Sequence, residues 1–422
     1  MTHSQQSGLK PTWQMMITLY LAMMSVGMGQ TVVFAILPML GRELALDQLV
    51  FQLPFGLGAL QGKELTITSL SALTAFSFFM AAPYMGRLSD RLGRKPLIIF
   101  GLCGYAVGTL IFNGVAALGL SGVLVGTMLY LLLVLSRVFH AVLMCSTHPA
   151  SAAYMADVTS VSERTKGMGK MQAFNQLGVM IGPALAWFVH ISYLAPLYIQ
   201  AGISFVVALM VWRFLPPLPV TRRKDQKVVS MSFFDPRYKL YILLSFIMYG
   251  LFGMVQQTLG FYFQDLLHID GVRASQIFSM AMVVSSAAML IAQFLVVQRY
   301  AGPPMRLLRR GLPFICLGYA LLANATTLPT LLLAMSLFGF GMALTASALA
   351  ASATMAVQSN EQGGLAGLLG STAGLGFMIG PLVGGGLYRI SPSYPYWCAA
   401  AIMFAVIVFL FTQGQREGSQ AK

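Results

Sequence analysis

Long apolar stretches alternate with short polar ones along the whole chain. The apolar stretches are mostly 20 or more residues long, and about 20 are enough to cross a hydrocarbon core roughly 30 Å thick. We therefore predict an all-α membrane protein with twelve transmembrane helices. Their expected positions are 13–39, 66–86, 96–116, 128–156, 165–188, 193–215, 239–265, 274–298, 307–326, 330–357, 363–388 and 394–413.

Composition supports this interpretation. Of the 422 residues, 57% are hydrophobic and 9% are charged, whereas about 25% are charged in ordinary soluble domains. The first apolar run is longer than the core of a signal peptide and no small-residue cleavage site follows it, so we expect a retained helix. The four cysteines are scattered through apolar runs without metal-ligand spacing, and we expect them to be packing residues.

The net charge of +14 is explained by topology. Four cations (Arg42, Lys63, Arg273 and Arg389) fall in predicted outer loops, and Arg137 falls within a helix. The other 21 of the 26 lysines and arginines lie on one side together with both termini. Positive charge marks the cytoplasmic side. We therefore expect a multi-pass protein of the inner membrane with both termini in the cytoplasm, and no nucleic-acid partner.

The chain contains an internal repeat. Residues 163–183 align without gaps to residues 361–381 at a constant offset of 198, with eight identities. Gln30 and Thr31 pair in the same way with Gln257 and Thr258 at an offset of 227. Repeated halves are common in transporters. We predict an N-terminal six-helix half at 1–215, a cytoplasmic linker at 216–238 and a C-terminal six-helix half at 239–422.

The most specific motif is GRLSDRLGRK, which runs from Gly86 to Lys95 between the second and third predicted helices. We expect Gly86 and Gly93 to permit a tight reversal. Asp90 is an acid among cations at a membrane boundary, where charge is costly unless it is paired. The simpler alternative is a basic cytoplasmic loop that happens to contain an acid, but this does not explain the spacing G-x-x-x-D-x-x-G-R-K.

This motif resembles the signature of the major facilitator superfamily, in its drug–proton antiporter-like branch that includes tetracycline exporters. Arg137 with the run from Ala152 to Gly169 resembles the fourth helix and following loop of that branch. The resemblance implies two pseudo-symmetric six-helix halves. It also implies a cytoplasmic gate formed by Gly86, Asp90, Arg91, Gly93, Arg94 and Asp157. In that gate Asp90 faces the start of helix 11, and Arg94 pairs with Asp157.

A second motif, Gly178-x-x-x-Gly182-Pro183, resembles the antiporter signature of the fifth helix. Its repeat copy comprises Gly376, Gly380 and Pro381. Glycines four residues apart let helices approach closely, and simple close packing would explain both copies. The fifth-helix copy has Ala186-Trp187 where a glycine pair is usual in the family, which weakens the inference to export.

None of the 12 acids is predicted to lie in the middle of the membrane. Arg137, His140, Met144 and His148 share one face of the fourth helix by their spacing. Because an arginine within the membrane is costly, we expect Arg137 to face a watery cavity or a partner. His140 and His148 are either proton carriers or satisfied core histidines, and the sequence favours neither.

Polar side chains on the first and seventh helices are candidates for the substrate pathway. They are Gln30, Tyr249, Gln256, Gln257 and Tyr262. Any of them could instead form hydrogen bonds between helices.

These observations favour a secondary active transporter. We expect proton-coupled export of a small anionic or neutral amphiphile, such as a carboxylate metabolite, a siderophore or a drug, by alternating access. An importer or uniporter on the same scaffold is the alternative. We expect no enzyme activity, because no nucleophile–base pair or metal cluster is evident. We also expect no cofactor, the proton gradient as energy source, a lipid bilayer as surroundings and a monomer.

Overall fold

The computed structural model describes residues 12–52, 59–159, 161–218, 232–358 and 361–420. The chain forms two compact units, Met1–Gln226 and Lys227–Lys422. The boundary between them falls inside the stretch 216–238 that the sequence assigns to a linker. The N-terminal part is called unit 1 below, and the C-terminal part unit 2.

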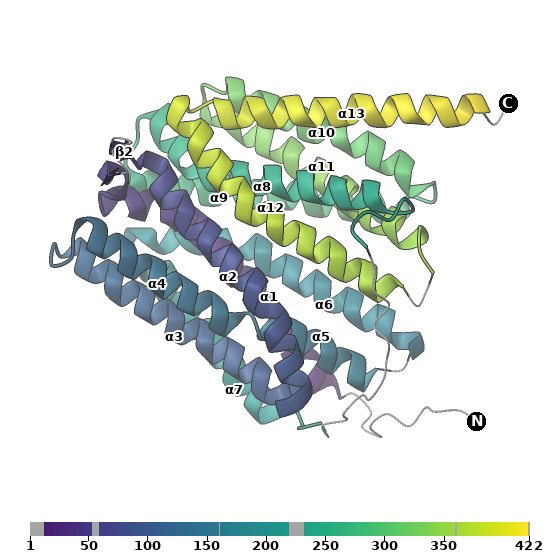
Figure 1. The fold of residues 1–422 in the computed structure, drawn as a ribbon, viewed down its shortest axis with the longest axis horizontal. Helices are drawn as coiled ribbons and strands as arrows, with labels where there is room; N and C mark the ends of the chain where they lie inside the picture. Colours follow the sequence, from purple (N-terminus) through teal and green to yellow (C-terminus); the bar gives the residue numbers. More distant parts are fainter. Residues whose placement is uncertain (1–11, 53–58, 160, 219–231, 359–360, 421–422) are drawn as a thin grey trace. The chain divides into compact units, whose positions relative to one another are not determined.

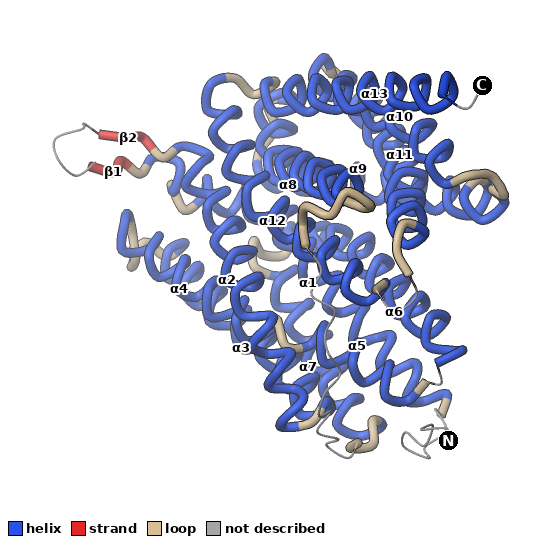
Figure 2. The backbone as a smooth tube through the Cα atoms, turned by 45° about the vertical axis from the view of Figure 1, so that its right-hand side comes forward, coloured by secondary structure: helices blue, strands red, loops and turns tan. Residues whose placement is uncertain are grey.

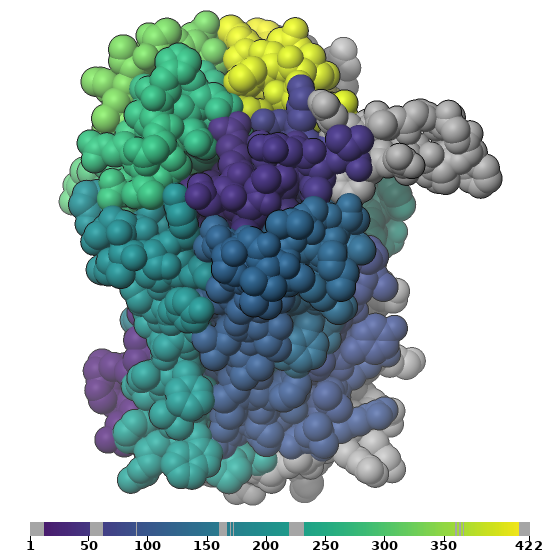
Figure 3. All heavy atoms as spheres, turned by 90° about the vertical axis from the view of Figure 1, so that its left-hand side faces the viewer, coloured from purple at the N-terminus to yellow at the C-terminus, as the bar shows by residue number. Residues whose placement is uncertain are grey.

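Unit 1 is a helical bundle with a short hairpin (Figures 1 and 2). Its elements are α1 (Trp13–Glu43), the 3-10 turn η1 (Leu46–Gln48), β1 (Val50–Gln52), β2 (Ala59–Gln61), α2 (Lys63–Leu92), α3 (Arg94–Leu120), α4 (Gly126–Met144), α5 (Thr147–Val158), α6 (Val161–Ile181), the 3-10 segment η3 (Gly182–His190) and α7 (Ala195–Phe214). Gly119 of α3 packs on Leu44 and Leu129, and Figure 3 shows this end of the unit, where the purple end of α1 lies near the blue residues of α3 and α4.

Unit 2 is also helical. Its elements are α8 (Lys239–Leu267), α9 (Gly271–Leu295), the 3-10 turn η4 (Val297–Arg299), α10 (Pro304–Asn324), α11 (Leu328–Met355), α12 (Gln362–Ile390) and α13 (Tyr394–Gln420).

The fold prediction of twelve helical segments is confirmed. Each predicted helix corresponds to one helix, or to two pieces that follow each other directly, within the described residues. Ten segments of this part of the chain are long and apolar enough to cross a membrane. The two others are α10, whose first turns carry several arginines, and α6 with η3.

The fourth predicted helix is not continuous. It is divided into α4 and α5 at Cys145 and Ser146. Proline has no backbone N–H, so Pro149 leaves the carbonyl of Cys145 without its usual helical donor. At this break the Ser146 hydroxyl donates to the carbonyl of Leu97 on α3 at 2.9 Å.

The fifth predicted helix also changes its character at a proline. It is α-helical up to Ile181, and from Gly182 it continues as the 3-10 segment η3, with Pro183 in its first turn. The tighter winding follows from the loss of an amide donor at Pro183.

One small feature was not predicted. In the predicted outer segment 41–65, β1 and β2 pair antiparallel, with Val50 opposite Gln61 and Gln52 opposite Ala59. Figure 2 shows the two strands in red, projecting from the helices of unit 1. Three-residue strands carry too weak a pattern for sequence periodicity to detect.

Candidate functional site

Arg137 of α4 lies inside unit 1, where it is 6% exposed. Its Nε donates to Oγ1 of Thr74 on α2 at 3.1 Å, and its Nη1 lies 3.3 Å from Nδ1 of His140. The guanidinium carbon lies 5.6 Å from the ring centroid of Phe112 on α3. A hydroxyl, an imidazole and an aromatic face therefore surround the charge. These neutral partners were not foreseen from the sequence.

The contact between Arg137 and His140 fixes the state of the imidazole. A guanidinium can only donate hydrogen bonds, so Nδ1 of His140 must accept and Nε2 must carry the proton. Nε2 is buried and has no hydrogen-bond partner in the described part of the chain. The ring packs edge-on against Tyr105, with centroids 4.6 Å apart and an angle of 77° between the planes. In this arrangement His140 is neutral.

Two further polar residues near this cluster were missed by the sequence analysis. Thr109 and Asn113 follow Tyr105 at intervals of four on α3, and both are buried. The hydroxyl of Thr109 and both amide atoms of Asn113 lack hydrogen-bond partners among the described residues. A polar face repeating every four residues on an otherwise apolar helix is the signal that could have revealed them.

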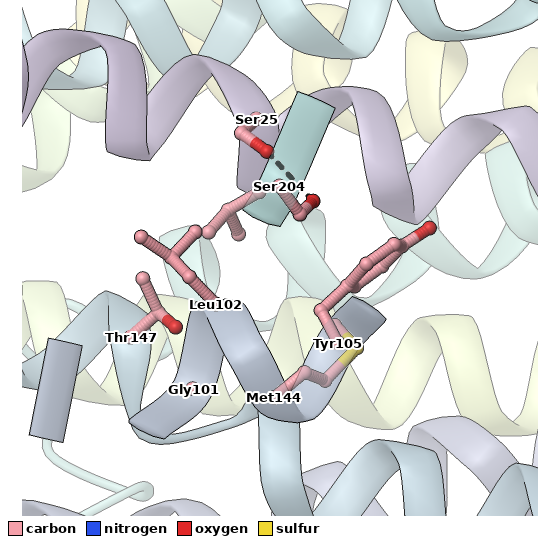
Figure 4. A pocket seen from close by; sticks show the side chains of 8 residues that line it. Ser25, Gly101, Leu102, Tyr105, Met144, Thr147 and Ser204 are labelled. Carbon is pink, nitrogen blue, oxygen red and sulfur yellow. Dashed lines mark hydrogen bonds between the residues drawn. The ribbon is translucent and has the colours of Figure 1, made fainter. Parts of the chain in front are cut away.

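A small cavity lies beside this cluster, between α1, α3, α4, α5 and α7 (Figure 4). Its volume is about 10 Å³, which is close to the space that one water molecule requires. Ser25 and Ser204 line it, and their hydroxyls are 2.9 Å apart. The side-chain amide of Gln200 donates to the carbonyl of Ser25 at 2.9 Å. The hydroxyls that Ser25 and Thr31 contribute from α1 therefore serve packing between helices, since Thr31 donates to the carbonyl of Val179 at 3.0 Å.

His148 lies beyond the break between α4 and α5. It is the second residue of α5 and is partly exposed. Arg137 and His140 are thus brought together, whereas His148 lies on the other piece of the fourth segment.

The gate motif is compact. Helix α2 extends to Leu92, so Gly86 is helical and the reversal occurs at Gly93 alone, with a φ of +97° that favours glycine. The prediction that Gly86 shares in the turn is therefore wrong, because the helix continues past it. Gly86 instead has Pro149 as its neighbour.

The expected ion pair within the gate motif is present. Nε of Arg94 lies 3.3 Å from Oδ2 of Asp157, and Nη1 of Arg94 donates to the hydroxyl of Ser89 at 2.7 Å. Arg91 is exposed. The side chain of Asp90 lies outside the described residues, so its expected position opposite helix 11 stays a prediction.

The glycine-proline motifs bring helices into direct backbone contact in both units. A Cβ on Gly178 would lie 2.0 Å from the carbonyl oxygen of Met24, and one on Gly182 would lie 2.6 Å from that of Met28. In unit 2, a Cβ on Gly376 or Gly380 would lie 2.6 Å or 2.3 Å from backbone atoms of Gly250. Thus α6 packs on α1 and α12 packs on α8, in agreement with the internal repeat. Pro183 and Pro381 follow directly in the two motifs.

The polar candidates on α1 and α8 differ in their surroundings. Gln30 is exposed, whereas Gln256 and Gln257 are buried and their amide atoms have no hydrogen-bond partners within the described ranges. The symmetric pair Gln30 and Gln257 therefore does not share an environment. Tyr249 packs against Phe377 with ring centroids 5.9 Å apart. The hydroxyl of Tyr262 donates to the carbonyl of Leu322 at 2.7 Å, which makes this tyrosine an interhelical link.

Asp265 lies in the last turn of α8, which ends at Leu267, two residues beyond the predicted helix end. Its Oδ2 accepts a hydrogen bond of 2.6 Å from the hydroxyl of Tyr388 on α12.

An ionic cluster joins the starts of α8 and α12. The guanidinium of Arg237 donates to both carboxylate oxygens of Asp235, with Nη2 to Oδ2 at 2.8 Å, and binds Glu361 through Nη1 and Nη2 at 3.0 and 3.1 Å. Hydrogen bonds from the Arg237 side chain hold the pKa values of Asp235 and Glu361 below their ordinary range. The backbone N–H groups of Arg237 and Gln358 act in the same direction.

Comparison with known proteins identifies relatives that match most of the chain. The model of the Major Facilitator Superfamily matches residues 19–360 and 306–422. Multidrug resistance protein 2 of Bacillus subtilis (strain 168) is 27% identical over 355 residues, covering 80% of this chain and 84% of the relative. The class G tetracycline resistance protein of Vibrio anguillarum is 29% identical over 412 residues, covering 92% and 95%. The crystal structure of the human organic anion transporter MFSD10 (TETRAN) matches with a TM-score of 0.66 at 19% identity, covering 95% of this chain and 100% of that one.

Proposed function

Because the chain belongs to the Major Facilitator Superfamily, we propose that it exports a small organic molecule in exchange for protons. Family membership makes it a multi-pass membrane transporter of small molecules, and not an enzyme. Relatives named for multidrug and tetracycline resistance support export as the direction. The proton gradient would supply the energy, and alternating access between two states would move the cargo. We further propose that it acts as a monomer.

The observation that carries this proposal is the environment of Arg137. Two of the five N–H groups of a guanidinium have partners here, Thr74 and His140, and both partners are neutral. An uncompensated cation within the membrane is costly and typically serves function. It repels cationic cargo and attracts a carboxylate or another anion. The cargo class that this charge supports is therefore an anionic or neutral amphiphile.

The same contact supports a coupling mechanism. If His140 took up a proton at Nδ1, it could no longer accept from Arg137, and two positive groups would face each other. Protonation of His140 and the bond between Arg137 and His140 therefore exclude each other. A proton arriving at His140 would release Arg137 to bind cargo or water, and loss of the proton would restore the bond.

The gate supports alternating access. The pair of Arg94 and Asp157 ties the start of α3 to the end of α5 at a membrane boundary. We propose that this network, with Asp90 and Arg91, stabilises the state that is closed to the cytoplasm and opens once in each cycle.

The experiment uses everted membrane vesicles that contain the chain. Candidate anionic, neutral and cationic compounds are offered with and without an imposed proton gradient. The expected result is accumulation of anionic or neutral compounds that depends on the proton gradient. Accumulation that is the same without the gradient would refute the coupling of transport to protons.

A matched variant tests the role of His140 in coupling. His140→Gln keeps an acceptor for Arg137 but cannot be protonated, so Arg137 would not be released, and we expect gradient-driven transport to be lost while the protein still reaches the membrane. Unchanged gradient-driven transport in this variant would show that the coupled proton binds at a residue other than His140.

One observation favours the alternative of an importer or uniporter. Ala186 and Trp187 stand in η3 where the antiporter signature usually has glycines, and Trp187 is exposed. Uptake into right-side-out vesicles that exceeds uptake into everted ones would select this alternative.

A further inference from the structure

A groove lies on the surface of unit 1, where α3 begins and α7 ends. Its volume is about 510 Å³. It is lined by Lys95, Pro96, Ile99, Phe100, Trp212 and Pro217. We propose that this groove binds an anionic glycerophospholipid. Its phosphate would lie at Lys95, and the upper part of its acyl chains would pack against Phe100 and Trp212.

The geometry of Lys95 provides the phosphate contact. Its Nζ donates to the backbone carbonyl of Trp212 at 2.7 Å. In a continuing helix this carbonyl would accept from the residue four positions later, but that residue is Pro216, which has no N–H. Lys95 thus satisfies an orphan carbonyl at the end of α7 and is held in place by it. An ammonium group has three N–H donors, so two remain for phosphate oxygens.

The surroundings of the groove carry the charge that an anionic lipid requires. Arg91 and Arg213 lie within a few residues of the lining and are exposed. Asp157 lies on the neighbouring α5 and forms an ion pair with Arg94, which offsets its negative charge. Basic pockets at the cytoplasmic boundary of membrane helices favour anionic headgroups, and each lysine near the surface adds about 1 kcal/mol to the attraction.

The depth of the groove suits a lipid rather than a dissolved anion. One membrane span begins at Arg94, and another ends at Phe214. The groove therefore lies at the boundary between headgroups and acyl chains. Phe100 and Trp212 are 44% and 64% exposed, and tryptophan is enriched in this layer.

The first experiment compares lipids on the full chain in detergent. Phosphatidylglycerol and phosphatidylcholine are titrated, and bound lipid is counted by native mass spectrometry. For the unmodified chain we expect phosphatidylglycerol to bind about fivefold more tightly, from the attraction of one lysine. Lys95→Met should lose this preference and Lys95→Arg should retain it.

The control is Lys239→Met, which removes an exposed lysine at the first position of α8 and should leave the preference intact. Equal binding of the two lipids by the unmodified chain would overturn the proposal. So would a preference that Lys95→Met leaves unchanged.

A second measurement leaves Lys95 unchanged, so it tests the lipid preference even if the Lys95→Met variant fails to fold. Trp13, Trp187 and Trp397 are replaced by phenylalanine, so that Trp212 is the one remaining tryptophan of the four in the chain. Brominated phosphatidylglycerol should quench its fluorescence at lower concentration than brominated phosphatidylcholine. Equal quenching by the two lipids would contradict the proposal.

Discussion

At the scale of single residues, the contacts of Arg137 depend on the shape of its guanidinium group as well as on its charge. Its Nε and Nη1 reach Thr74 and His140 in two different directions. Lysine carries the same charge on a compact ammonium group and lacks this fork.

We therefore expect Arg137→Lys to reduce transport by roughly tenfold or more, the effect of losing a charged hydrogen bond, with normal protein levels in the membrane. The measurement is initial transport rate in vesicles, normalised to protein content. Thr74→Val, which removes one acceptor of Arg137 and keeps the charge, should give a smaller loss. A rate for Arg137→Lys equal to that of the unmodified chain would show that only charge matters.

The ion pair of Arg94 and Asp157 permits a charge exchange. Asp157→Asn should abolish most transport while the protein still reaches the membrane, because the closed state of the gate loses its ionic contact. The exchanged variant Arg94→Asp with Asp157→Arg should recover part of the rate, as coupled residues do in a double-mutant cycle. If the exchange recovers nothing and Asp157→Asn remains active, the pair has no role in gating.

At the scale of elements, the closest packing involves glycines that face backbone. Gly376 and Gly370 lie on the same helix α12, yet a Cβ on Gly376 would lie 2.6 Å from the backbone nitrogen of Gly250, whereas one on Gly370 would meet nothing within 4 Å. The helix thus provides its own control.

Gly376→Ala should destabilise the protein by about 1–3 kcal/mol, the usual cost of overpacking. Gly370→Ala should be neutral or stabilising by up to about 1 kcal/mol, because alanine is the better helix former. Thermal unfolding in detergent compares the two variants. Similar unfolding temperatures for both would show that α8 and α12 can separate without cost.

The cluster of Asp235, Arg237 and Glu361 should make stability depend on pH. The pKa values of the two carboxyl groups are lowered from 3.8 and 4.5. A lowered pKa in the folded state contributes stability that is full above the unfolded pKa and is lost as the pH falls through the folded pKa.

We therefore expect Arg237→Gln to lower the unfolding temperature slightly at neutral pH, since exposed ion pairs contribute little. The difference from the unmodified chain should vanish as the pH falls well below the carboxyl pKa values of about 4. Unfolding temperatures of both proteins across this pH range provide the test. A difference that does not change with pH would assign the effect to packing.

At the scale of the whole molecule, the asymmetric distribution of cations makes a prediction about orientation. A reporter fused after Lys422 should be active only in the cytoplasm, and one inserted in the segment 53–58 should be active only outside, following the positive-inside rule. Fluorescent and periplasmic enzyme reporters at the two positions measure this. Activity of both reporters on one side would contradict the twelve-span topology.

Ten of the helical segments could be predicted because their apolar length is enough for a membrane span. The ion pair of Arg94 and Asp157 could also be predicted, from the motif between the second and third helices. The close approach of helices at Gly376 could be predicted from the internal repeat. The partners of Arg137 were not, because Thr74 and Phe112 come from helices whose relative rotation the sequence does not reveal. The break before Pro149 and the change to 3-10 winding at Pro183 were accessible in principle, since each proline removes one backbone donor.

The break in the fourth segment has a consequence for evolution. Arg137 and His140 lie before it on α4, while Asp157 lies after it on α5. The residue that carries the buried charge and the residue that pairs with Arg94 therefore belong to different helical pieces. A lineage can substitute residues of α4 to suit a new cargo without replacing Asp157.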